Sequence, residues 1–169
     1  MRKWLLVLTL AAVFFIDNVF ADNVVVFGFR ADVMLAAVVA LGVLAGPLTG
    51  SAAGLILGLI TDIVFNKIVG LSALTYMFSG LAGGFFYRKF YADNLIIPTV
   101  TAMICSFIKE HVFLIAAKLS GGRPPYFYTL ASYMIPCFLL TGGICALLYI
   151  FFKHALFKPL WRNEAIKLE

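Results

Sequence analysis

Charged side chains are scarce in this chain. Only 12% of its 169 residues are Asp, Glu, Lys or Arg, 63% are hydrophobic, and the mean hydropathy is +1.04. Soluble domains carry about 25% charged residues. The composition excludes an ordinary soluble domain. It predicts one all-α integral membrane domain, residues 1–169, with room for six transmembrane helices.

Cysteine and histidine are also few. Cys105, Cys137 and Cys145 fall in apolar segments without paired spacing, which indicates neither a disulfide framework nor a zinc site. His111 and His154 are far apart, and no nucleophile–base, phosphate-loop or metal-binding motif occurs. We therefore expect no enzyme activity, no cofactor and no metal site.

The net charge of +5 is carried by loops and tails, which argues against a nucleic-acid partner. A six-span arrangement with a cytoplasmic amino terminus puts eight basic residues inside: Arg2, Lys3, Arg88, Lys89, Lys153, Lys158, Arg162 and Lys167. It leaves Arg30, Lys67 and Arg123 outside, so the positive-inside rule predicts two cytoplasmic termini. Val19-Phe20-Ala21 after a basic start also resembles a signal-peptide cleavage site, but we favour a retained first helix.

Six apolar segments are predicted to span the bilayer. They cover about residues 4–20, 31–45, 47–65, 70–87, 95–119 and 127–152. The second is short for a hydrocarbon core of ~30 Å, so it either begins earlier or thins the bilayer locally. Pro136 and Gly142-Gly143 are expected to kink the sixth.

Glycines recur at a spacing of four in the third segment. Gly46, Gly50, Gly54 and Gly58 form one ridge on a helix that begins near Pro47. Such a ridge lets a neighbouring backbone approach closely in lipid. The spacing predicts a close helix contact, either inside the bundle or with a partner helix.

Within the predicted spans, the polar residues expected to be buried are Asp62, Lys109, Glu110 and His111. Asp62 and Lys109 both lie ~21–23 Å from the cytoplasmic ends of their helices at 1.5 Å per residue. Opposite charges at matching depth are expected to pair, because an unpaired charge there is costly. Alternatively, Asp62 reaches outer-face water or caps the loop near Asn66, while Lys109 snorkels or joins Glu110 and His111.

The order of these motifs, within about residues 31–90, resembles the rod shape-determining protein MreD family. The matching motifs are a Gly-Pro turn, a glycine-spaced helix ending in Gly-Leu-x-x-Asp, a Gly-Leu-x-Ala-Leu turn and a Gly-x-x-Gly helix. Here they are Gly46-Pro47, Gly50 to Asp62, Gly70 to Leu74, and Gly80 to Gly83. The residues expected to serve helix packing or partner binding are Gly46, Pro47, Gly50, Gly54, Gly58, Gly80 and Gly83.

The resemblance implies a non-catalytic scaffold of the bacterial cell elongation (rod) complex in the inner membrane. Members of that family bind MreC, which has one span and a periplasmic coiled coil. They help couple MreB filaments to the peptidoglycan synthases RodA and penicillin-binding protein 2. The implied six-helix fold resembles the substrate-binding subunits of energy-coupling-factor transporters. The alternative function is therefore a small-solute-binding subunit of such a transporter.

Overall fold

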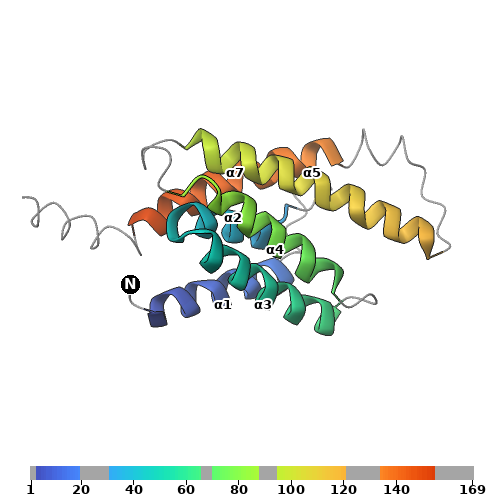
Figure 1. Cartoon of the computed structure of the whole chain (residues 1–169), viewed down its shortest axis with the longest axis horizontal. Helices are drawn as coiled ribbons and strands as arrows, with labels where there is room; N and C mark the ends of the chain where they lie inside the picture. Colours follow the sequence, from blue (N-terminus) through green and yellow to red (C-terminus); the bar gives the residue numbers. More distant parts are fainter. Residues whose placement is uncertain (1–2, 20–30, 66–69, 88–94, 121–133, 155–169) are drawn as a thin grey trace, which may run out of the picture.

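A computed structural model describes residues 3–19, 31–65, 70–87, 95–120 and 134–154, and all the regular structure in these ranges is helical. The helices are α1 (Lys3–Val19), α2 (Val33–Ala45), α3 (Pro47–Phe65), α4 (Leu71–Gly84), α5 (Ile96–Leu119) and α7 (Ile135–Phe152). They lie along one common direction, with the beginning of α1 and the end of α7 at the same end of the bundle (Figure 1). The predicted all-α class is confirmed.

Three of the helices, α3, α5 and α7, are long and apolar enough to cross a membrane. Their outer faces carry large exposed apolar side chains, such as Ile56 on α3, Ile104 on α5 and Leu147 on α7. A surface of this kind is favourable in lipid and unfavourable in water. Length and surface together agree with a membrane protein.

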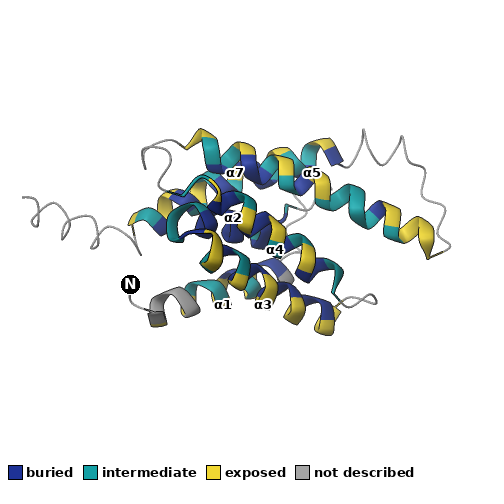
Figure 2. Cartoon of the chain, in the orientation of Figure 1, coloured by how far each residue is buried: buried dark blue, intermediate teal, exposed yellow. Residues whose placement is uncertain are grey.

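The short helix α2 is the centre of the bundle. It contacts each of the other five described helices, and residues 34–41 are fully buried. Figure 2 shows it enclosed by helices whose outer faces are exposed. A helix that is apolar on every side is stable only when it is buried on every side. Because protein surrounds α2, its 13 residues do not have to match the thickness of a bilayer.

The turn between α2 and α3 is built on Gly46. This residue has φ +100°, a conformation that glycine adopts without a steric penalty, and its N–H donates to Gly42 O at 2.9 Å. Pro47 then starts α3. Its missing N–H is harmless there, since the first N–H groups of a helix have no intrahelical acceptor.

The glycine ridge of α3 packs inside the bundle, mainly against α4. A Cβ added to Gly54 would collide with the backbone carbonyl of Tyr76, and one added to Gly58 would lie 2.5 Å from the Ala73 Cα. At Gly50 the nearest atom is the Gly42 Cα of α2, at 2.6 Å. Of the two alternatives for the ridge, the structure shows internal packing.

Glycines on α4 and α2 complete this interface. A Cβ at Gly80 would meet the backbone of Gly50, one at Gly83 would lie 2.6 Å from Val39 O, and one at Gly42 would meet Gly80 O. The three helices therefore touch backbone to backbone. We call α2, α3 and α4 the glycine-packed unit.

The ends of α4 and α7 differ from the predicted spans. Helix α4 ends at Gly84, and residues 85–87 form a turn. Helix α7 begins at Ile135, whereas residues 127–133 of the predicted span lie outside the described ranges. Pro136 stands in the first turn of α7, where the missing N–H of proline costs no intrahelical hydrogen bond. The expected kink at Pro136 and Gly142-Gly143 stays a prediction.

Candidate functional site

Polar side chains from five helices meet where α2 begins. Asp17 comes from α1, Asp32 precedes α2, Tyr76 lies on α4, Lys109 on α5 and Thr141 on α7. Four of the five are buried, and Lys109 leaves only 15% of its side chain exposed. We call these five residues the polar cluster. Within the described residues of this apolar chain, the cluster brings an ion pair and several hydrogen bonds together.

The cluster provides hydrogen-bond acceptors for the backbone N–H groups at the amino-terminal end of α2. The Asp32 N–H donates to Thr141 Oγ1 at 3.1 Å, and the Val33 N–H donates to Asp17 Oδ1 at 3.0 Å. The Leu35 N–H donates to Asp32 Oδ1 at 2.8 Å, which makes Asp32 the N-cap residue. The first N–H groups of a helix lack intrahelical acceptors, and water is scarce inside a bundle. Side chains of α1 and α7 supply the missing acceptors.

The cluster also holds an ion pair. The Lys109 ammonium donates to Asp32 Oδ2, and the Tyr76 hydroxyl lies 3.3 Å both from Asp32 Oδ1 and from Lys109 Nζ. The Lys109 nitrogen also lies 5.0 Å from the centroid of the Tyr76 ring and 5.4 Å from that of Phe113. Each charge is thus met by an opposite charge, by a hydrogen bond or by an aromatic face, as a charge removed from water requires.

The predicted pair between Asp62 and Lys109 is wrong, because Lys109 contacts Asp32 instead. Asp62 is fully buried and caps α4. It accepts the N–H of Gly70 at 2.8 Å, of Ser72 at 3.3 Å and of Ala73 at 3.1 Å. Helix α4 needs this help because its own N-cap, Gly70, has no side chain. The loop-capping alternative was closer, although Asn66 itself lies outside the described residues.

At two helix starts in the bundle, backbone N–H groups are therefore accepted by an aspartate of the preceding helix. Asp17 of α1 accepts an N–H at the start of α2, and Asp62 of α3 accepts three at the start of α4. Asp17, Asp62 and Lys109 lie 13 to 15 residues after the first residues of α1, α3 and α5, residues 3, 47 and 96. Asp17 and Asp62 thus accept N–H groups at the starts of neighbouring helices, and Lys109, at a similar place along α5, pairs with the N-cap residue of α2.

Glu110 and His111 follow Lys109 on α5 and are half-buried. The His111 ring nitrogen Nδ1 lies 3.0 Å from the carbonyl oxygen of Phe107, one turn earlier, and the two rings are 4.3 Å apart. His111 therefore interacts within its own helix. Among the described residues, no group of three His, Cys, Asp or Glu side chains could hold a metal ion.

Four residues of the polar cluster were not predicted: Asp17, Asp32, Tyr76 and Thr141. Asp32 carried a usable signal, because an Asp directly before an apolar helical run is a typical N-cap. Asp17 lies near the end of the first predicted span, and no role was predicted for it. Tyr76 and Thr141 had no local signal, since their role depends on residues brought from other helices.

Comparison with protein-family models, with curated proteins and with solved structures finds no match to this chain. The function proposed below therefore rests on the order of the motifs and on the contacts of the described residues. Fold likeness alone would not establish a function in any case.

Proposed function

We propose that the chain is a non-catalytic scaffold of the bacterial cell elongation complex, with six spans and both termini on the cytoplasmic side of the inner membrane. Its direct partner is MreC, through which it helps couple MreB filaments to RodA and penicillin-binding protein 2. We further propose that the six helices are arranged as in the substrate-binding subunits of energy-coupling-factor transporters.

The observation that carries this proposal is the physical connection between the MreD-like motifs. Gly46 makes the turn into α3, the glycine ridge packs on α4, and Asp62 caps the helix start at Gly70. Gly80 of α4 lies directly against the backbone of Gly50 on α3. Motifs that are separate in the sequence thus build one body, so their joint occurrence has a common physical cause.

The chemistry of the site favours a scaffold over an enzyme. Lys109 and Asp32 neutralise each other, and Asp62 is occupied by backbone N–H groups. Groups engaged in this way stabilise the bundle and are poorly placed to act as a nucleophile or a general base. A rigid body with an apolar outer surface suits a protein that holds other membrane proteins together.

The test is co-purification from membranes of the native host. The full chain carries an affinity tag, an unrelated tagged membrane protein serves as the control, and quantitative mass spectrometry identifies the bound proteins. We expect MreC among the most enriched proteins. The variant Gly54→Leu, which disrupts the glycine-packed unit, should lose this enrichment, while the lipid-facing variant Ile56→Leu should keep it.

The same preparation separates the scaffold from the transporter alternative. A small-solute-binding subunit would be stabilised against heat by its ligand through mass action, by about 2.7 kcal/mol at one hundred times the dissociation constant. Stabilisation by one member of a panel of water-soluble vitamins, without enrichment of MreC, would replace the scaffold by the transporter subunit.

A further inference from the structure

The bundle contains two kinds of helix interface. Inside the glycine-packed unit, backbones touch, and an added Cβ would collide with backbone atoms at Gly42, Gly54 and Gly80. Between α5 and α7, by contrast, a Cβ at Gly142 would meet the flexible side chain of Met103. Backbone contacts of the first kind leave no side chain that can rearrange, so the unit resists internal movement.

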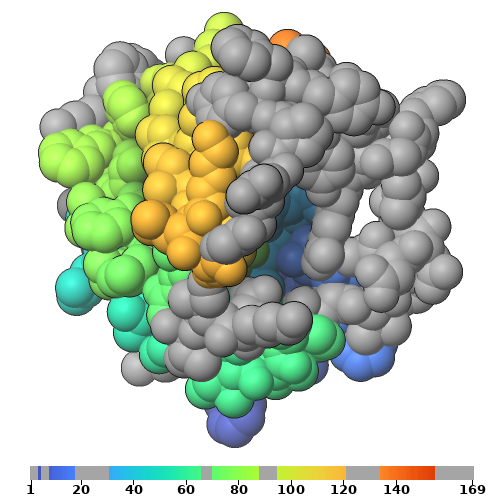
Figure 3. Space-filling view, turned by 90° about the vertical axis from the view of Figure 1, so that its right-hand side faces the viewer, coloured from blue at the N-terminus to red at the C-terminus, as the bar shows by residue number. Residues whose placement is uncertain are grey.

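The contact between α4 and α5 is small compared with the contact between α5 and α7. Figure 3 shows α5, in yellow to orange, lying against α4, in green, at the surface of the molecule. Side-chain contacts between these helices include that of Cys105 of α5 with Ser79 of α4 and that of Lys109 of α5 with Tyr76 of α4. We call this contact the α4–α5 seam.

Helix α7 contacts both α2 and α5. The Cys145 thiol lies 3.6 Å from the Ala36 carbonyl oxygen of α2 and 3.4 Å from that of Pro98 on α5, and Thr141 accepts the Asp32 N–H. The end of α5 that carries Lys109 is joined to the glycine-packed unit by the ion pair, in which Lys109 reaches across the seam to Asp32.

We propose that the Asp32–Tyr76–Lys109 ion-pair network is a latch that keeps the α4–α5 seam closed, and that loss of the pair lets α5 move away from α4 while the glycine-packed unit stays intact. The reason is the mechanical difference between the interfaces. The seam is a small contact with an ion pair at its centre, whereas backbone packing along whole helices holds the unit. The inference does not depend on which partner the chain binds.

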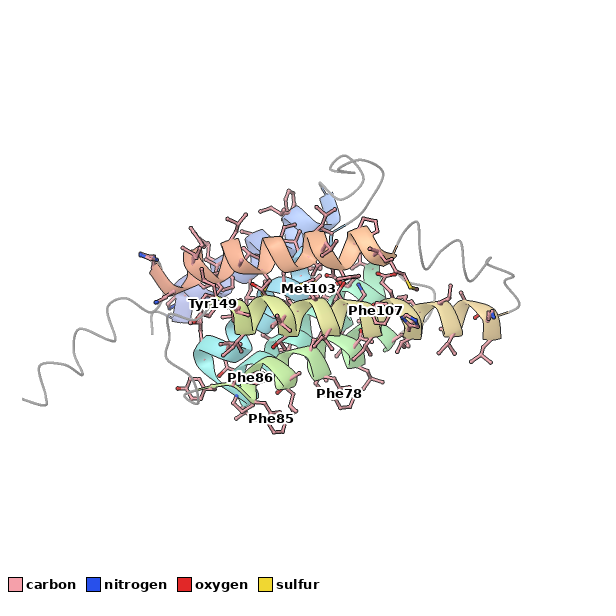
Figure 4. The ribbon with its side chains drawn as sticks, turned by 90° about the horizontal axis from the view of Figure 1, so that it is seen from above. Phe78, Phe85, Phe86, Met103, Phe107 and Tyr149 are labelled. Carbon is pink, nitrogen blue, oxygen red and sulfur yellow. The ribbon has the colours of Figure 1, made fainter. Side chains whose placement is uncertain are left out.

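Each of the two helices of the seam offers an exposed position for a probe. Phe78 on α4 is 61% exposed and Phe107 on α5 is 39% exposed. Figure 4 shows both, at neighbouring places along the two helices. A matched control pair lies within the glycine-packed unit, at Ile56 on α3 and Leu74 on α4, which are also exposed. Spin labels at such sites disturb little of the packing.

The test measures the distance between two spin labels by double electron–electron resonance, in the full chain in lipid nanodiscs with its three native cysteines replaced. Labels at positions 78 and 107 report the seam, and labels at 56 and 74 report the unit. In Lys109→Met and in Asp32→Asn we expect the seam distribution to lengthen and broaden, with the unit distribution unchanged.

Two results would overturn the latch. An unchanged seam distance in both variants would mean that the ion pair does not hold the seam, and lengthening in both label pairs would mean that it holds the whole bundle. The double variant Asp32→Asn with Lys109→Met removes both charges and leaves neither buried alone, so it tests the same prediction if the single variants do not fold. It should broaden the seam distribution alone, and no change would again reject the latch.

Discussion

Lys109 contacts Asp32 across 77 residues of chain, and the Tyr76 hydroxyl lies within 3.3 Å of both side chains. Asp32 has a second task, because its Oδ1 accepts the Leu35 N–H at the start of α2. One carboxylate thus both caps the central helix and neutralises the lysine of α5. Its removal affects helix stability and charge pairing together.

The first prediction concerns the free energy of unfolding in mixed micelles. Lys109→Met and Asp32→Asn should each destabilise by up to about 3–5 kcal/mol, because each leaves a buried charge without its partner. The double variant should lose less than the sum of the two, with a coupling of about 0.5–3 kcal/mol. Additive losses would show that the pair contributes nothing of its own.

The two single variants and the double variant form a double-mutant cycle. Its matched control uses Asp62→Asn in place of Asp32→Asn. Asp62 caps α4 and does not share the Lys109 ammonium, so its loss and that of Lys109→Met should add within about 0.5 kcal/mol. Coupling between Asp62 and Lys109 of the size expected for Asp32 would restore the pairing that the structure rejects.

The second prediction concerns Asp62 as a cap. Asp62→Ala leaves the N–H groups of Gly70, Ser72 and Ala73 without this acceptor and should cost at least about 2 kcal/mol of stability. Hydrogen exchange should quicken at Ser72 and Ala73 in particular. Thr75→Ala is the control, because its hydroxyl donates only to carbonyls of its own helix, at Leu71 and Ser72. Equal effects of the two changes would contradict the capping role.

The third prediction compares two glycines. Gly54→Ala places a methyl group against the backbone carbonyl of Tyr76, so α3 and α4 must separate at a cost of about 1–3 kcal/mol. Gly143→Ala on α7 meets no atom within 4 Å and should be neutral or gain up to about 1 kcal/mol from helix propensity. Thermal unfolding in detergent distinguishes the two. Equal tolerance would mean that the glycine contact does not hold the unit together.

The fourth prediction concerns topology and falls on positions outside the described residues. With the native thiols replaced, a cysteine at Arg123 should react with a membrane-impermeant maleimide in intact spheroplasts. One at Glu164 should react only after the membrane is permeabilised. Labelling of position 164 in intact spheroplasts would reverse the proposed orientation.

Local patterns predicted much of the fold. The apolar segments gave the all-α class, and the four-residue spacing of glycine led to the α3–α4 contact because each glycine removes one side chain from the same helix face. Gly46 and Pro47 marked the turn because the backbone at these positions tolerates few other residues. These features depend on residues that are close in the sequence.

The polar cluster could not be predicted in the same way. Asp62 and Lys109 were predicted to pair because they lie at the same depth in the membrane. Depth does not determine which side of a helix faces which neighbour. Asp32 lies at the start of the predicted span 31–45 and was not included among the polar residues expected to be buried there. Its partner depends on how α5 packs against α2, which no local pattern specifies. The short length of α2 was likewise explained only by the helices that surround it.

The most direct test of the proposed scaffold is depletion of the protein from its host while cell width and the sites of new peptidoglycan are imaged with a fluorescent D-amino acid. We expect rods to widen and become round, with side-wall insertion lost, and we expect the wild-type chain but not Gly54→Leu to restore them. Cells that keep their width and their side-wall insertion after complete depletion would contradict a role in cell elongation.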